Sequence, residues 1–175
     1  MISLVDDLLD VSHFEAGEKY KIILKKEYIS KIIEEVVKAQ LNLAREKDIV
    51  IDFSPDCLKN VVVKVDKVKI FQVFENIVNN SVKYTKPGGM IYIDCKIEDN
   101  GVTYIVKDNG VGIPAHQIGR LFERFFRGEN VISTESGTGL GLYIAKYIIE
   151  KHNGRIWCES KENIGTTFYI YLPLA

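Results

Sequence analysis

Apolar residues recur along this chain with two different periods, and each period predicts one kind of secondary structure. Spacings of three and four residues predict helices over residues 2–15, 28–47, 67–84, 115–126 and 140–151. Alternation and short β-rich runs predict strands over 20–24, 49–53, 61–65, 90–97, 102–107, 155–160 and 166–172. Helices and antiparallel strands alternate too irregularly for a doubly wound sheet. The pattern therefore predicts an α/β fold of the two-layer sandwich type.

The first helix, over residues 2–15, carries an apolar seam that includes Ile2, Val5, Leu8 and Leu9. A helix of this length is marginally stable alone in water, so we expect it to pack against something. Two partners are open at this point: a helix outside this chain, or the rest of its own domain.

Composition narrows the class of protein without deciding its function. The chain has 175 residues, of which 46% are hydrophobic and 27% charged, as expected for one globular domain. Its formal net charge of −1 gives no general electrostatic case for binding nucleic acid or an anionic membrane. The start of the chain resembles no signal peptide, and no apolar run approaches the roughly 20 residues that span a bilayer. The widely spaced Cys57, Cys95 and Cys158 predict reduced, largely buried thiols in a cytoplasmic protein.

The helix over 67–84 has an unusual polar face. Opposite its apolar stripe lie Gln72, Asn76, Asn79, Asn80 and Lys83. Asn76 and Asn80 are four residues apart, so their amides project from the same side. Asparagine is a poorer helix former than Glu or Lys, and its amide oxygen can ligate Mg²⁺. The face therefore indicates either a polar ligand with a magnesium ion or an ordinary solvated surface.

Two glycine-bearing turns offer close backbone approach to a ligand. In the first, 108–114, Gly110 and Gly112 follow Asp108, which can accept a hydrogen bond from an exocyclic amine such as that of adenine. The alternative is a glycine-rich turn in which Asp108 only forms the turn. The second, 137–142, opens a helix and so predicts a phosphate cradle of backbone amides. Its spacing fits neither a P-loop nor a dinucleotide fingerprint.

The segment between these turns adds aromatic and basic residues. Phe122, Phe125 and Phe126 are expected to pack in the core, while Arg124 and Arg127 are candidate phosphate contacts. The polar run 129–136 has the composition of a loop that closes over a ligand.

In this order the four motifs resemble the nucleotide-binding domain of sensor histidine kinases, in the GHKL superfamily. The N box is 66–85, the first glycine box 108–114, the phenylalanine box 121–127 and the second glycine box 137–142. Residues 1–17 resemble the end of the second dimerisation helix, which leaves 18–175 as the ATP-binding domain. Ser81 stands where the family usually has Ala, and the loop after the phenylalanine box is short.

The resemblance implies a mixed, mostly antiparallel sheet with helices on one face, and an ATP pocket. Asp108 would read the adenine amino group, Tyr84 would border the base, and Asn80 would hold Mg²⁺ with Asn76 near it. Lys83, Arg127 and Arg124 would contact phosphates. Asn76, Lys83 and Arg127 would form the catalytic set. The remaining nucleotide contacts would come from Gly110, Gly112, Gly137, Thr138, Gly139, Leu140 and Gly141.

The acceptor of the phosphoryl group is expected outside this chain. None of His13, His116 and His152 is followed by Glu and then Pro, as the family's phosphoacceptor is. The resemblance thus implies a protein-histidine kinase whose partners are ATP, the parent's dimerisation domain and, indirectly, a response regulator. It implies a cytoplasmic location, with a parent protein that can be membrane-anchored.

One position separates kinase from hydrolase. In the superfamily's ATPases the residue one turn before the metal asparagine is a Glu that activates water, and here that residue is Asn76. A neutral amide cannot take a proton at pH 7, so we expect ATP binding with little hydrolysis. Three alternatives remain open: a gyrase-like or mismatch-repair-like ATPase, a serine-directed kinase of the same fold such as an anti-sigma factor, and a non-catalytic regulatory module.

Overall fold

A computed structural model describes residues 4–15, 21–53, 61–98, 100–128 and 137–175 of the chain. Its helices are α1 (Leu4–Glu15), α2 (Ile29–Glu46), α3 (Lys67–Tyr84), α4 (Ala115–Ile118) and α5 (Gly141–Lys151). Its strands are β1 (Lys25–Tyr28), β2 (Val50–Phe53), β3 (Val62–Val65), β4 (Met90–Glu98), β5 (Gly101–Asp108), β6 (Arg155–Lys161) and β7 (Gly165–Pro173).

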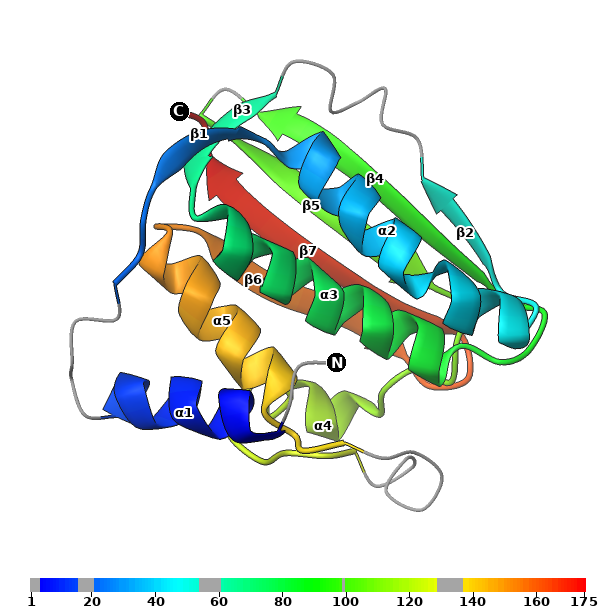
Figure 1. Cartoon of the computed structure of the whole chain (residues 1–175). Coiled ribbons are helices and arrows are strands. Elements are labelled where there is room, and N and C mark those ends of the chain that lie inside the picture. The colour runs from blue at the N-terminus through cyan, green and yellow to red at the C-terminus, as the bar shows by residue number, and fades with distance from the viewer. Residues whose placement is uncertain (1–3, 16–20, 54–60, 99, 129–136) are drawn as a thin grey trace.

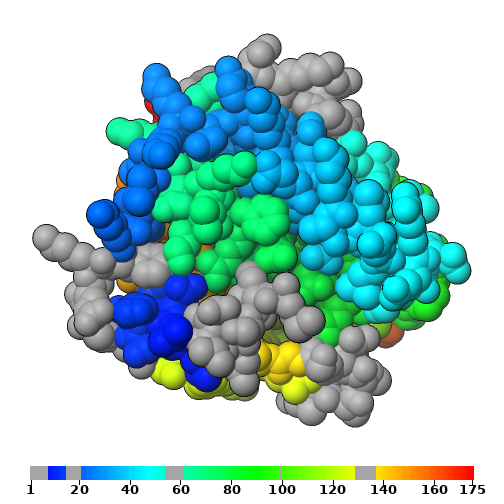
Figure 2. Space-filling view, viewed as in Figure 1, coloured from blue at the N-terminus to red at the C-terminus, as the bar shows by residue number. Residues whose placement is uncertain are grey.

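A five-stranded sheet in the order β2-β4-β5-β7-β6 forms one layer of the molecule. The β2–β4 pair is parallel and the other pairs are antiparallel. The helices α2, α3 and α5 cover one face of this sheet (Figure 1). Seen from the helical side, α1, α2 and α3 make up much of the surface (Figure 2). The expected two-layer sandwich, with a mostly antiparallel sheet and helices on one face, is therefore confirmed.

The core lies between the helices and the sheet, and the apolar stripes of the helices fill it. On α3 the side chains of Ile70, Phe74, Ile77 and Val78 are fully buried, at the i, i+4, i+7, i+8 spacing that faces one side of a helix. The ring of Phe74 meets that of Tyr104 on β5 edge-on, with 5.4 Å between centroids. This packing fixes which face of α3 looks into the sheet and which face is left for other contacts.

A second, two-stranded sheet lies next to the C-terminus of the chain. The strands β1 and β3 form a separate antiparallel pair. Near it, Ala175 donates its backbone N–H to the carbonyl of Val62 at 3.3 Å, so the C-terminus lies beside β3 (Figure 1).

The helix α1 packs on its own domain, but through side chains other than those of the predicted apolar seam. Val11 and Phe14 are buried, and the Phe14 ring stacks on Tyr147 of α5 with 3.7 Å between centroids. Asp10 accepts hydrogen bonds from Lys69 at 3.2 Å and from the Gln72 amide at 3.0 Å, both on α3. Leu8 and Leu9 remain exposed on the other side of α1.

Several sequence-based expectations were wrong. The strand expected over 20–24 is found instead at Lys25–Tyr28, as β1, because β1 pairs with β3; residues 21–24 lie in no strand. The helix expected over 115–126 ends at Ile118, and turns follow it. Phe125 has a φ of +62°, which an α-helix does not allow, and it is exposed rather than part of the core. Cys95 and Cys158 are free thiols that are half-buried, and Cys57 lies outside the described residues.

Candidate functional site

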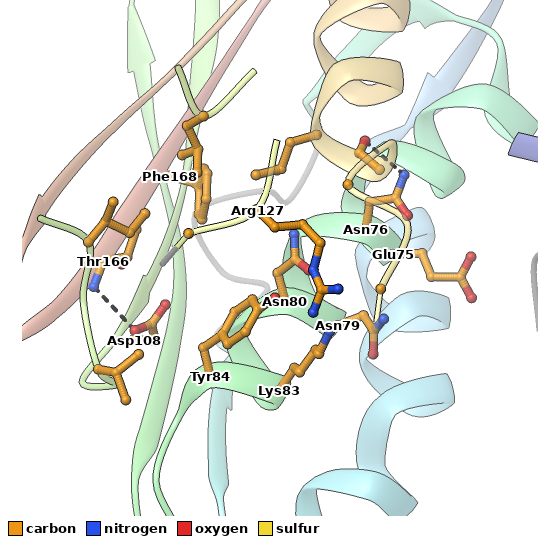
Figure 3. A pocket seen from close by; sticks show the side chains of 18 of the residues that line it. Glu75, Asn76, Asn79, Asn80, Lys83, Tyr84, Asp108, Arg127, Thr166 and Phe168 are labelled. Carbon is orange, nitrogen blue, oxygen red and sulfur yellow. Dashed lines mark hydrogen bonds between the residues drawn. The ribbon is translucent and has the colours of Figure 1, made fainter. Parts of the chain in front are cut away.

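A cleft of about 740 Å³ opens between the polar face of α3, the end of α2 and the two glycine boxes. The sequence-predicted site residues that line it are Asn76, Asn80, Lys83, Tyr84, Asp108, Gly112, Arg127, Gly137, Thr138, Gly139 and Gly141. Gly110, Arg124 and Leu140 do not line it. Figure 3 shows side chains from α3, β5 and β7 around one common space.

Asp108 closes the inner end of the cleft at the last position of β5. Only 5% of its surface is exposed. Its carboxylate accepts hydrogen bonds from the backbone N–H of Gly110 at 2.9 Å and of Thr166 at 3.2 Å, and from the Ser81 hydroxyl at 3.3 Å. Burial raises the pKa of Asp108, while these three hydrogen bonds oppose the shift. A carboxylate has about four acceptor positions, so it keeps capacity for one more donor from a ligand.

The asparagine face of α3 meets the second glycine box. The Asn76 amide donates a hydrogen bond to the carbonyl of Gly141 at 3.1 Å, where α5 begins (Figure 3). A Cβ at Gly141 would lie 3.2 Å from the Asn76 side chain, so glycine allows this close approach. The Asn80 amide, by contrast, makes no hydrogen bond to any residue that the structure describes. It is therefore available to a ligand, as is the amide of Asn79, which also lines the cleft.

The first glycine box is fastened to the end of α3. Val111 donates its N–H to the carbonyl of Tyr84 at 3.1 Å, and a Cβ at Gly110 would collide with that same carbonyl. Gly112 has a φ of +66°, and a Cβ there would collide with the carbonyl of Lys161. Gly110 thus serves the packing of the turn and does not line the cleft, and its expected contact with a nucleotide stays a prediction.

The second glycine box lies against the phenylalanine box. Gly139 has a φ of +72°, and a Cβ there would lie 2.7 Å from the carbonyl carbon of Phe125. Leu140 is fully buried, and its N–H donates to the Thr138 hydroxyl at 3.2 Å. That amide is used within the turn, and the expected contact of Leu140 with the nucleotide stays a prediction. Gly137, Thr138, Gly139 and Gly141 remain at the cleft.

Basic side chains reach the cleft from two directions. Lys83 lines it from α3, and its amine would lie 3.1 Å from a Cβ at Gly137. Arg127 lines it from the far side and points toward Asn80 and Lys83 (Figure 3). Arg124 does not take part, because its guanidinium lies 4.7 Å from the centre of the Phe125 ring. The cleft therefore joins a carboxylate at its inner end to two cations near the glycine turns.

Comparison with known proteins identifies this arrangement. The family described as "Histidine kinase-, DNA gyrase B-, and HSP90-like ATPase" matches residues 65–175. The chain belongs to this family. Sensor protein kinase WalK of Staphylococcus aureus is 35% identical over 178 residues, which cover 99% of this chain and 28% of WalK. The chain thus spans under a third of the length of this relative.

Solved structures give the same result for the fold. The catalytic domain of histidine kinase ThkA has a TM-score of 0.74 and 29% identity, covering 87% of this chain and 96% of that one. ThkA in complex with the response regulator protein TrrA has a TM-score of 0.75 and 26% identity, covering 98% of this chain and 48% of that one. The chain is an ATP-binding catalytic domain of the sensor histidine kinase type, as the four motifs indicated.

Some cleft residues escaped sequence reasoning. Thr166 and Phe168 of β7 border Asp108, and Gln40, Leu43 and Lys47 of the α2 region form another wall. Thr166 and Phe168 lie in the segment that resembles the family's final hairpin, which was a usable signal. Lys47 gave no such signal, because helical periodicity cannot show which carbonyl groups of another helix a lysine side chain reaches.

The residues present fit a magnesium ion that is bound together with phosphates. No group of three His, Cys, Asp or Glu side chains that could hold a metal occurs among the described residues. Mg²⁺ needs no such group, because it keeps several waters and shares substrate phosphates with one or two protein oxygens. The amide oxygen of Asn80, at the cleft and without a partner among the described residues, is suited to that role.

The helices that the structure describes were compared with the length and hydropathy that a membrane span needs. None of them is long and apolar enough to cross one. The polar run 129–136, expected to close over a ligand, lies outside the described residues.

Proposed function

We propose that this domain binds Mg²⁺–ATP in the cleft and transfers the γ-phosphoryl group to a histidine outside this chain. One observation carries the proposal: a single cleft brings together a buried carboxylate, an unpartnered asparagine amide and the basic side chains of Lys83 and Arg127. These are the groups that an adenine, a magnesium ion and a triphosphate require, and they lie in the order base, metal and phosphate.

The residues divide the work by their chemistry. Asp108 accepts a hydrogen bond from the exocyclic amine of adenine, and Tyr84 borders the base. Asn80 holds Mg²⁺, which would neutralise part of the phosphate charge when bound. Lys83 and Arg127 contact phosphates, and the amides of Gly137 and Gly139 face the same anion. Phosphoryl transfer depends mainly on positioning and charge neutralisation, which this set supplies.

The nucleophile in this transfer is a neutral imidazole. A ring nitrogen of the acceptor histidine forms a bond to the γ-phosphorus, and the bond from that phosphorus to the β,γ-bridging oxygen breaks. ADP leaves with the electron pair of that bond, and the acceptor ring loses its N–H proton to solvent. The acceptor belongs to the dimerisation domain of the parent kinase, and a response regulator receives the phosphoryl group afterwards, as the ThkA–TrrA complex suggests by analogy.

Hydrolysis by water is disfavoured because the cleft lacks a base one turn before Asn80. Asn76 occupies that position, and its amide is bound to the carbonyl of Gly141. The neighbouring Glu75 is directed away from Asp108 and Tyr84 (Figure 3). Glu75 lines the cleft and burial raises its pKa, but it lies about 100° around the helix from Asn76 and so outside the position that the base of the ATPases occupies. This separates the proposed kinase from the gyrase-like ATPases of the family.

We also propose the boundary and location expected from the sequence. Residues 1–17 are the end of a dimerisation helix, and 18–175 form the ATP-binding unit. The free thiols of Cys95 and Cys158 suit the reducing cytoplasm.

A transfer assay tests the function. The chain is mixed with γ-labelled ATP, Mg²⁺ and a separately produced dimerisation domain that bears the acceptor histidine. We expect label on that domain, labile to acid and stable to base, and none when its histidine is replaced by Ala. Wild-type chain that binds no ATP would favour a regulatory module instead. Label on a serine, or rapid phosphate release, would point to the other two alternatives.

A further inference from the structure

The last four carbonyl groups of α3 all accept hydrogen bonds, that of Ser81 from the C-cap residue of the helix and the next three from donors elsewhere in the chain. The last turn of a helix leaves four carbonyls without partners inside the helix, and they need donors from elsewhere. The carbonyl of Ser81 accepts from the N–H of Thr85 at 3.0 Å, and that of Tyr84 accepts from the N–H of Val111 at 3.1 Å. The two carbonyls between them, of Val82 and Lys83, both accept from Lys47.

Lys47 reaches these carbonyls from another helix. It is the C-cap residue of α2, and its amine donates to the carbonyl of Val82 at 3.3 Å and to that of Lys83 at 2.7 Å. A cation at this place also faces the negative end of the α3 dipole. Its own carbonyl accepts from the N–H of Gly88, just after α3. Lys47 therefore joins the end of α2 to the end of α3 by side chain and backbone.

The end of α3 is the part of the helix that the cleft uses most. Asn80, Lys83 and Tyr84 all lie within its last five residues and line the cleft. The Tyr84 carbonyl is also the anchor of the first glycine box, through Val111. Any fraying of this turn would therefore displace the base-bordering ring, the phosphate lysine and the glycine turn together.

We propose that Lys47 is a positioning residue for the nucleotide, which acts by capping the α3 C-terminus rather than by binding phosphate. Two of its three N–H donors are directed at carbonyl groups, although the residue itself lines the cleft. The proposal rests on the proposed function, since it concerns binding at the same site.

Two measurements on Lys47→Met test the proposal. The first is hydrogen exchange without nucleotide: the amides of Val111 and Thr85 should exchange about tenfold faster, because the end of α3 loses a charged hydrogen-bond donor. The second is calorimetric affinity for ATP, ADP and adenosine, well below the melting temperature. We expect all three affinities to fall by a similar factor of about tenfold, and Lys47→Arg to restore them to within about twofold.

The control is Lys38→Met, which removes the same charge from an exposed position on α2. It should leave both measurements unchanged. If Lys47→Met does not fold, Lys47→Gln, which keeps a neutral N–H donor, is measured with the same expected directions.

Three results would overturn the proposal. Unchanged affinities with a lower melting temperature would show a purely structural lysine. A loss that grows from adenosine to ATP would show a direct phosphate ligand. Normal exchange at Val111 and Thr85 would show that the α3 end does not depend on Lys47. These three results all concern variants at Lys47. A failure of the proposed function would be seen in the wild-type chain instead, which would then bind no ATP.

Discussion

The side-chain amide of Asn76 donates a hydrogen bond to the backbone carbonyl of Gly141 at 3.1 Å, joining α3 to the first residue of α5. An amide at this position is therefore structural as well as chemically unable to serve as a base. The same residue that we expect to make hydrolysis slow also holds the second glycine box against the asparagine face.

Replacing Asn76 by Asp should test this link. The carboxylate is nearly isosteric, but it cannot donate to the Gly141 carbonyl, so two acceptors would face each other. We expect a loss of about 1–3 kcal/mol in the free energy of unfolding and weaker ATP binding. Urea denaturation and calorimetry measure these quantities. Asn42→Asp, at an exposed site on α2, should change neither, and an unaffected Asn76→Asp would contradict the structural role.

Replacing Asp108 by Asn should remove adenine recognition. The NH₂ group of the new amide would face either the N–H groups of Gly110 and Thr166, which are themselves donors, or the exocyclic amine of the ligand. In either case one acceptor of the carboxylate is lost. We expect ATP affinity to fall by about ten- to a hundredfold, the cost of a charged hydrogen bond. Adenosine should lose a similar factor. If adenosine and ATP bound as tightly as to wild type, Asp108 would not be the base-reading residue.

The affinity for ATP should also depend on pH through Asp108. Burial raises the pKa of this carboxyl, so its ionised form is lost at a higher pH than for an exposed Asp. Since the ionised form is the better acceptor, affinity should be full above this raised pKa and should fall as pH drops through it. Calorimetry across the acidic range measures this affinity. A separate pH titration of adenosine without protein gives the protonation of adenine, so that its contribution can be subtracted. Affinity that rises on acidification would contradict the assignment.

His152 should make the fold sensitive to acid. It is buried, accepts from the N–H of Asp66 at Nε2 with a separation of 3.0 Å, and lies with Nδ1 2.7 Å from the Ile148 carbonyl. The neutral ring satisfies both contacts, with Nδ1 as donor. Burial lowers the pKa of His152 in the folded chain, so the unfolded chain binds a proton first as pH falls. The stability contributed by the neutral ring is therefore present above pH about 6.5 and is lost as pH falls from there through the lowered folded pKa.

Comparison with His152→Gln measures this term. The free energy of unfolding of wild type should drop more steeply between pH 7.5 and 5 than that of the variant. Equal slopes for the two proteins would show that His152 does not carry the effect.

The docking of α1 should depend on a single ring. Phe14 is buried and stacks on Tyr147, so Phe14→Ala would remove most of the apolar contact that holds α1. We expect faster hydrogen exchange over residues 8–14 while the sheet stays protected, with a cost of about 3–5 kcal/mol to the docked state at most. Ser12→Ala, at an exposed site, is the matched control. Removal of residues 1–17 should likewise leave a folded remainder, and a chain that unfolds without them would contradict the proposed boundary.

The sequence predicted best those elements whose apolar period is long and strong. The stripe of Ile70, Phe74 and Ile77 located α3 within the chain and indicated which face it buries. The same stripe left the asparagines on the opposite face, which is where the cleft lies. Much of the candidate site was predictable, because the apolar stripe of α3 shows which side chains face away from the core, and because two turns are rich in glycine.

The errors arose where tertiary contacts overrule local pattern. β1 has the sequence Lys-Lys-Glu-Tyr, which no alternation rule selects, and it is a strand because β3 lies beside it. Phe122, Phe125 and Phe126 suggested a helix, yet Phe125 adopts a left-handed backbone where the close approach of Gly139 constrains the chain. The roles of Gly110, Leu140 and Lys47 depend on which carbonyl or hydroxyl lies opposite each of them. Such information exists only after folding.

The asparagine-bearing helix is clamped at both of its ends. At its start, Asp66 caps the N–H groups of Val68 and Lys69 and is itself bound to His152. At its finish, Lys47 and Val111 hold the terminal carbonyls. The wall of the cleft that α3 forms is thus held in place from both ends before any nucleotide binds, so its asparagines need no reordering to meet a ligand.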